Sequence, residues 1–117
     1  MADEKNLLST IGLCRAAGKT VIGTDMICDA IAKKRRLVGM SESELEGVIV
    51  IEASDTSANT HKKLTDKCKY YNVTRVRLEN ADCEKLGRAV GKSAVAAVAI
   101  MDENLCRAIR SKLSRFE

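Results

Sequence analysis

The sequence predicts a three-layer α/β/α sandwich, in which helices cover both faces of a sheet. Two observations carry this prediction: apolar residues recur at helical spacing in several segments, and short apolar or β-branched runs separate those segments. The chain has 117 residues, no proline and only seven glycines, which is the size and composition of one compact, helix-rich unit. We therefore expect a single domain over residues 1–117.

The first two predicted helices flank a short β-branched step. Residues 4–17 carry apolar side chains at intervals of three and four residues, and a glycine follows them, so they form an amphipathic helix. The step is residues 20–22, after which Thr24 or Asp25 can cap the second helix. That helix ends in the basic run 33–36, a favourable charge for the negative end of its dipole.

The middle of the chain contains two strand patterns around a helix. Residues 47–51 are apolar and largely β-branched, as expected for a strand that is covered on both faces. Residues 59–71 repeat the helical spacing of apolar side chains. In residues 73–78 apolar and polar side chains alternate well enough to predict a second strand, and Arg75 and Arg77 share its more open face.

The last third of the chain gives a helix, a strand and a further helix. A short helix is predicted over residues 82–90, before a glycine. Residues 94–100 form a strand of small apolar residues, which lets helices pack closely against it. Asp102 can cap the final helix, in which Leu105 and Ile109 belong to the inward stripe.

Composition narrows the classes of function. The first residues lack the basic start and apolar run of a secretory signal, and no stretch approaches the roughly 18 apolar residues of a membrane span. The five cysteines show no Cys-x-x-Cys spacing, and His61 is the only histidine, so neither zinc nor disulfides are indicated. We expect a reduced, monomeric, cytoplasmic protein with no metal, no cofactor and no membrane contact.

Catalytic motifs are incomplete in this sequence. Gly18-Lys19-Thr20 resembles the end of a phosphate-binding P-loop, but Leu13 stands where that motif has its first glycine. His61, which we expect at a helix start, has no evident cysteine or serine partner that it could activate as a nucleophile. We predict that the protein is not an enzyme.

The charges are unevenly placed around a net charge of +4. Basic residues gather in 33–36, 62–69 and 107–115, and an acidic middle of the chain includes Glu52. A basic side would attract nucleic-acid phosphates, although solvated helix faces explain each cluster equally well. Only three aromatic residues are present, too few for the stacking platform that binds single-stranded RNA, so any RNA partner should be folded.

Three segments together resemble one superfamily over nearly the full length of the chain. They are Ala17–Gly23, Ala53–Thr60 leading into Lys62–Cys68, and Leu86–Lys92. The sequence resembles the kink-turn RNA-binding superfamily that includes the ribosomal proteins seven-Ae and thirty-e, and within it the bacterial YlxQ-like branch. The resemblance implies one ribosomal-protein-like RNA-binding domain with a mixed four-stranded sheet, in which residues 20–22 are the fourth strand.

The resemblance also implies where RNA binds, namely at the start of the second helix and at the loop before the last strand. A helix start offers unpaired N–H groups and a positive dipole end to phosphates, and Gly23 has no side chain to obstruct close approach. Nearby lysines can add phosphate contacts. The implied RNA-binding residues are Lys19, Gly23, Thr24, Asp25, Met26, Asp29, Lys33, Gly91, Lys92 and Ser93. The expected partner is structured ribosomal or other non-coding RNA, with the ribosome as a possible assembly.

Three positions depart from the strongest form of the family pattern, which has Asn-Glu followed three residues later by Lys. This chain has Asp25, Met26 and Asp29 there. An ionised carboxylate only accepts hydrogen bonds, so Asp25 cannot donate to a guanine as an amide can, and Asp29 places negative charge near phosphate. The sequence is thus compatible with two hypotheses. The protein binds kink-turn-like RNA, or it is a protein-interaction module of the ribosome or translation machinery without RNA specificity of its own.

Overall fold

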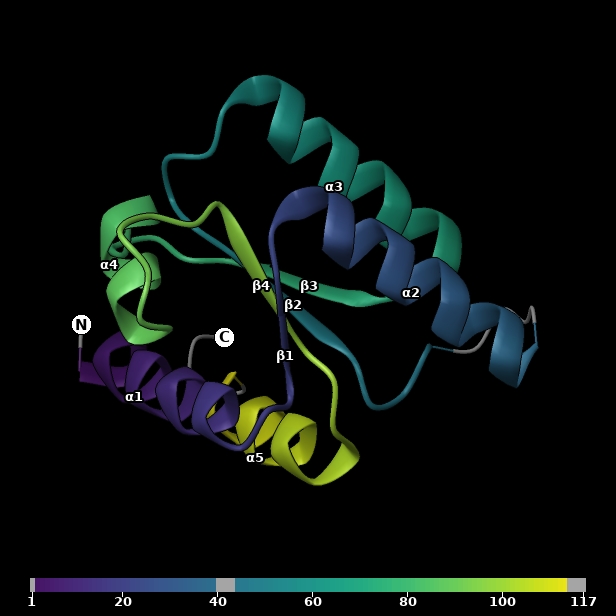
Figure 1. Cartoon of the computed structure of the whole chain (residues 1–117), viewed down its shortest axis with the longest axis horizontal. Coiled ribbons are helices and arrows are strands. Elements are labelled where there is room, and N and C mark those ends of the chain that lie inside the picture. Colours follow the sequence, from purple (N-terminus) through teal and green to yellow (C-terminus); the bar gives the residue numbers. More distant parts are fainter. Residues whose placement is uncertain (1, 40–43, 114–117) are drawn as a thin grey trace.

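The computed structural model describes residues 2–39 and 44–113, in which four strands form one mixed sheet (Figure 1). The sheet order is β1-β4-β2-β3. β2 runs parallel to β3, whereas β4 is antiparallel to both β1 and β2. The strands are β1 (Thr20–Ile22), β2 (Ile49–Glu52), β3 (Thr74–Arg77) and β4 (Ala97–Ile100). The mixed four-stranded sheet, with residues 20–22 as its short fourth strand, is therefore confirmed.

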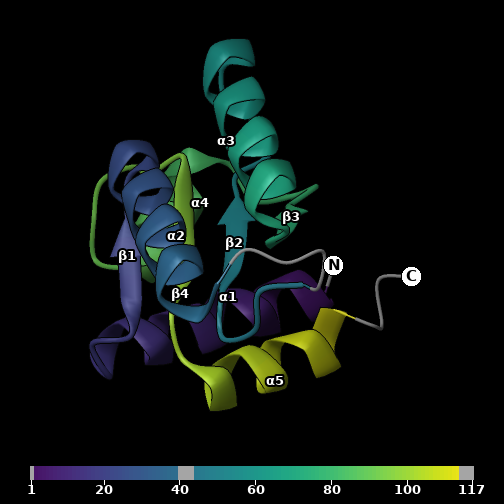
Figure 2. The same ribbon diagram turned by 90° about the vertical axis from the view of Figure 1, so that its right-hand side faces the viewer.

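Helices cover both faces of this sheet, as the alternation of patterns predicted (Figures 1 and 2). Ile49 and Ile51 point into one apolar core with helices α1, α4 and α5, whereas Val50 between them points into a second core with α2 and α3. This alternation follows from the two-residue repeat of a strand. The helices are α1 (Ala2–Ala16), α2 (Thr24–Val38), α3 (Ala58–Tyr71), α4 (Cys83–Ala89) and α5 (Glu103–Leu113).

The structure shows the N-terminal caps of the two helices for which the sequence predicted one. The carboxylate of Asp102 accepts a hydrogen bond from the Leu105 N–H at 2.9 Å, so the predicted cap of the last helix is confirmed. The predicted cap of the second helix is wrong. Gly23 occupies the N-cap position and no side chain caps the helix, while Thr24 and Asp25 already belong to its first turn. Gly23 has a φ of 100°, a conformation that favours glycine.

All five cysteines are free thiols, and four of them are buried. Burial raises the pKa of Cys68 to about 11, and burial together with a hydrogen bond to Asp55 raises that of Cys83 to about 11. At neutral pH both thiols are therefore protonated and weakly nucleophilic. Among the described residues, no cluster of side chains could hold a metal ion, and no helix is long and apolar enough to cross a membrane.

Candidate RNA interface

The sheet brings the start of α2 next to the residues that lead into β4. β1 pairs with β4 so that Ile22 lies opposite Val98. One residue further, the Gly23 N–H donates to the carbonyl of Ala97 at 3.4 Å. Figure 1 shows the same proximity, with α2 beginning above the sheet where the loop from α4 enters β4. The start of α2 and the first residue of β4, about seventy residues apart in sequence, therefore lie together.

The loop between α4 and β4 is fixed to α4 by backbone hydrogen bonds. The Lys92 N–H donates to the Gly87 carbonyl at 2.8 Å, and the Val95 N–H donates to the Cys83 carbonyl at 3.0 Å. Gly91, Lys92 and Ser93 are all exposed. The loop thus presents a lysine and a serine to solvent from a backbone that is already positioned.

One face of the first three turns of α2 is open to solvent. Asp25, Asp29 and Lys33 are exposed, and their spacing of four residues places them on neighbouring positions of one helix face. Met26 is 63% exposed, which is high for a large apolar side chain, and Thr24 is half-buried. A large ligand could reach these side chains, but the face that they form carries two carboxylates beside a single lysine.

The structure separates Lys19 from the start of α2. Lys19 precedes β1, and its carbonyl accepts a hydrogen bond from the Met101 N–H at 2.8 Å, at the end of β4 remote from Ala97. Three strand residues lie between Lys19 and Gly23, so their Cα atoms are about 13 Å apart at roughly 3.3 Å per residue. Lys19 could therefore reach only a different phosphate from the one at the start of α2.

Lys63 of α3 lies at the start of α2. No pattern in the sequence indicated that it belongs to the site. The Lys63 ammonium forms an ion pair and a hydrogen bond with the Asp25 carboxylate. This hydrogen bond, with the attraction between the charges, lowers the pKa of Asp25 and raises that of Lys63. The two residues are 38 positions apart, so no local pattern could have paired them.

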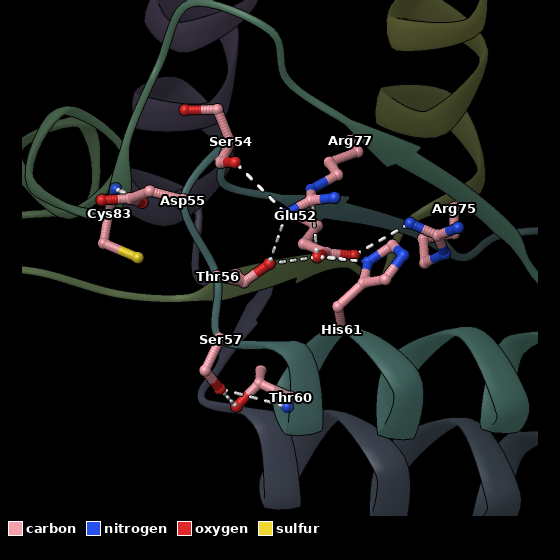
Figure 3. Close-up of polar contacts among 10 residues, drawn as sticks. All are labelled: Glu52, Ser54, Asp55, Thr56, Ser57, Thr60, His61, Arg75, Arg77 and Cys83. Atoms are coloured by element: carbon pink, nitrogen blue, oxygen red, sulfur yellow. Dashed lines mark hydrogen bonds and ion pairs between the residues drawn. The ribbon is translucent and has the colours of Figure 1, made fainter.

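The end of β2 holds a buried carboxylate surrounded by cationic and hydroxyl groups (Figure 3). Glu52 is fully buried and accepts a hydrogen bond from Arg75 at 2.8 Å and one from Thr56. Its Oε2 also lies 2.8 Å from Nδ1 of His61 and 3.5 Å from Nε of Arg77. We call these five residues the Glu52 cluster. It joins β2, β3 and the first turn of α3, beside Ala97 of β4.

The Glu52 cluster gives these residues contacts that the sequence did not indicate. Glu52 of the acidic middle of the chain is buried, and Arg75 and Arg77 of the more open strand face both pair with it. His61 lies at a helix start as expected, but it contacts Glu52, whereas Ser57 caps α3. Burial raises the pKa of Glu52, but the hydrogen bonds from Thr56 and His61 and the charges of His61 and Arg75 outweigh it and lower the pKa overall. Glu52 is therefore ionised at neutral pH and holds three elements together.

Comparison with known proteins gives one close sequence relative and several structural ones. No family model matches the chain. The RNA-binding protein YlxQ of Bacillus subtilis (strain 168) is 34% identical over 103 residues, which are 88% of this chain and 90% of that protein. The YlxQ name refers to binding and not to a reaction, in agreement with the prediction that this chain is not an enzyme.

Two solved structures share the fold over most of their length. A protein of unknown function from Bacillus halodurans C has a TM-score of 0.76 and 25% identity, and the match covers 92% of this chain and 96% of that one. The 15.5kD RNA binding protein of Giardia lamblia has a TM-score of 0.72 and 17% identity, with coverages of 98% and 88%. Because the identity to YlxQ exceeds 30% and extends over most of both proteins, the chain belongs to the YlxQ family.

Proposed function

We propose that this protein binds structured RNA, in particular kink-turn-like elements of ribosomal or other non-coding RNA, through the start of α2 and the loop before β4. The observation that carries the proposal is the identity to YlxQ, a protein named for RNA binding, over 88% of the chain. The hydrogen bond between Gly23 and Ala97 supports the position of the site, because it places the start of α2 beside the strand into which the loop leads.

The chemistry of this surface fits a phosphate backbone better than a base edge. The first amides of α2 have no side-chain cap, so they remain available to an anion at the positive end of the helix dipole. Lys92 and Ser93 add a charged and a neutral donor from the adjacent loop. We expect the protein to act as a monomer in the cytoplasm, with the ribosome as the assembly in which its RNA is found.

Salt dependence should separate RNA binding from a role in protein interaction alone. Lys92→Ala should weaken binding to all folded RNAs and reduce the slope of log K against log salt by about one, because one phosphate contact is lost. Lys19→Ala should do the same if the RNA extends along β1. Filter binding at several salt concentrations measures both effects, with Lys69→Ala on the last turn of α3 as the control. Binding of the parent chain without salt dependence would favour the protein-interaction module.

Reversing the charge at Asp29 should strengthen binding. Asp29→Lys removes a carboxylate from the open face of α2 and adds an ammonium, so affinity for any folded RNA should rise about fivefold near 0.1 M salt and by less in high salt. Glu103→Lys makes the same charge change on α5, at the opposite end of β4, and should have a smaller effect. Equal gains for the two variants would mean that net charge, and not the start of α2, governs binding.

A further inference from the structure

The start of α2 poses an electrostatic problem for RNA binding that its own residues do not solve. Asp25 and Asp29 are both exposed beside the helix amides that would receive a phosphate. Two carboxylates at this point would repel the phosphate and reduce the attraction of the helix dipole. A positive charge close to these carboxylates would offset the repulsion.

Lys63 of α3 is located where that positive charge is needed. α2 and α3 lie side by side on one face of the sheet in both views (Figures 1 and 2). The Lys63 ammonium binds the Asp25 carboxylate, and Asp29 is close enough to contribute to its raised pKa. The ammonium is therefore paired with one carboxylate of α2 and is attracted by the charge of the other, although it belongs to a different helix.

The Asp25–Lys63 ion pair is open to solvent. The side chains of Asp25 and Lys63 are 83% and 48% exposed, respectively. Water and salt screen such a pair, so it contributes little to the stability of the fold and can exchange partners readily. An RNA phosphate offers Lys63 an equivalent anion, and its binding also releases condensed counterions, which favours the exchange.

We propose that Lys63 is a phosphate-binding residue of the RNA interface, and that Asp25 holds its ammonium at the start of α2 until RNA phosphate takes the place of the carboxylate. This inference rests on the proposed function and extends the interface from α2 and the β4 loop onto α3. It assigns Asp25 the role of a competitor for Lys63, in addition to its repulsion of phosphate.

Four variants test the proposal against a kink-turn RNA with tandem sheared G·A pairs. Lys63→Gln should weaken binding about fivefold near 0.1 M salt and lower the salt slope by about one, as expected for one lost phosphate contact. Lys63→Arg should retain the affinity of the parent. Asp25→Asn should strengthen binding in the parent chain, because it releases Lys63, and should strengthen it less when combined with Lys63→Gln. The double variant thus measures the coupling between the two residues.

The controls separate this inference from the proposed function. Lys69→Gln removes an equal charge from another side of α3 and should change affinity less than Lys63→Gln. If the parent chain binds RNA and Lys63→Gln binds it with the same affinity and slope, the inference is wrong and the proposed function stands. An equal gain from Asp25→Asn with and without Lys63 would show that Asp25 only repels phosphate, which would also overturn the exchange. If the parent binds no folded RNA, both proposals fail.

Discussion

Replacing Glu52 by glutamine should lower the free energy of unfolding by about 3 kcal/mol, because removing one partner of a buried ion pair leaves its other members uncompensated. The carboxylate is fully buried, and Arg75 is its most enclosed cationic partner, with 22% of its side chain exposed. A glutamine keeps the shape but has only one acceptor oxygen for Thr56, His61 and two arginines. The melting temperature should fall by roughly 10 °C for a domain of this size.

The pH dependence of stability provides a second measurement on the same variant. The pKa of Glu52 is lowered from its ordinary value of 4.5 by the folded structure. Its contribution is therefore fully present above pH 4.5 and is lost as the pH falls through the folded pKa. Urea unfolding at pH 7 and at a series of pH values below 4.5 should show the difference between parent and Glu52→Gln shrinking as the solution becomes more acidic.

A matched control for this variant is Glu84→Gln on α4. Glu84 forms an ion pair with Arg88 one helical turn away, but 62% of its side chain is exposed. Its loss should change the free energy of unfolding by no more than about 0.5 kcal/mol. Similar losses for the two variants would mean that the Glu52 cluster does not join β2, β3 and α3 energetically.

The elements of the fold were predictable because their signals are local. The spacing of Leu7, Ile11 and Cys14, and the apolar run that became β2, report the periods of a helix and a buried strand directly. The cap by Asp102 was predictable for the same reason, since donor and acceptor lie three residues apart. The prediction of a side-chain cap for α2 was wrong because the N-cap residue is Gly23 in an unusual backbone conformation. A glycine has no side chain that would mark this position in the sequence, whereas Thr24 next to it is a common capping residue.

The polar contacts of the candidate site were not predictable because they join distant residues. Arg75 reaches Glu52 across 23 positions, and both looked like surface charges when taken alone. One signal was available: a strand, a helix and a second strand in succession favour adjacent parallel strands, which would have put Glu52 beside Arg75 or Arg77. Nothing comparable relates Asp25 to Lys63, since α2 and α3 are separated by β2 and each exposed helix face carries several charges.

Gly87 links the packing of α4 to the proposed RNA interface, and Gly87→Ala should impair both stability and binding. At an unconstrained helix position this change would stabilise the protein by about 0.5 to 1 kcal/mol. Here the new Cβ would lie 2.6 Å from Cα and 2.8 Å from N of Ala94. Because these are backbone atoms, α4 or the loop must move, and overpacking of this kind costs about 1 to 3 kcal/mol. We expect a net loss of about 1 to 2 kcal/mol.

The same displacement should move Lys92 and Ser93 from the positions that the hydrogen bonds to α4 give their loop, so RNA affinity should fall several-fold at a temperature where the variant is folded. Gly39→Ala is the control: its φ of 91° strains any side chain, by about 1 to 2 kcal/mol, but a Cβ there meets no atom of the described chain within 4 Å. Thermal unfolding and filter binding of both variants should give similar losses of stability and unequal losses of affinity. Equal affinities would mean that the position of the loop does not matter for RNA, and the interface would then have to be sought on α2 and α3 alone.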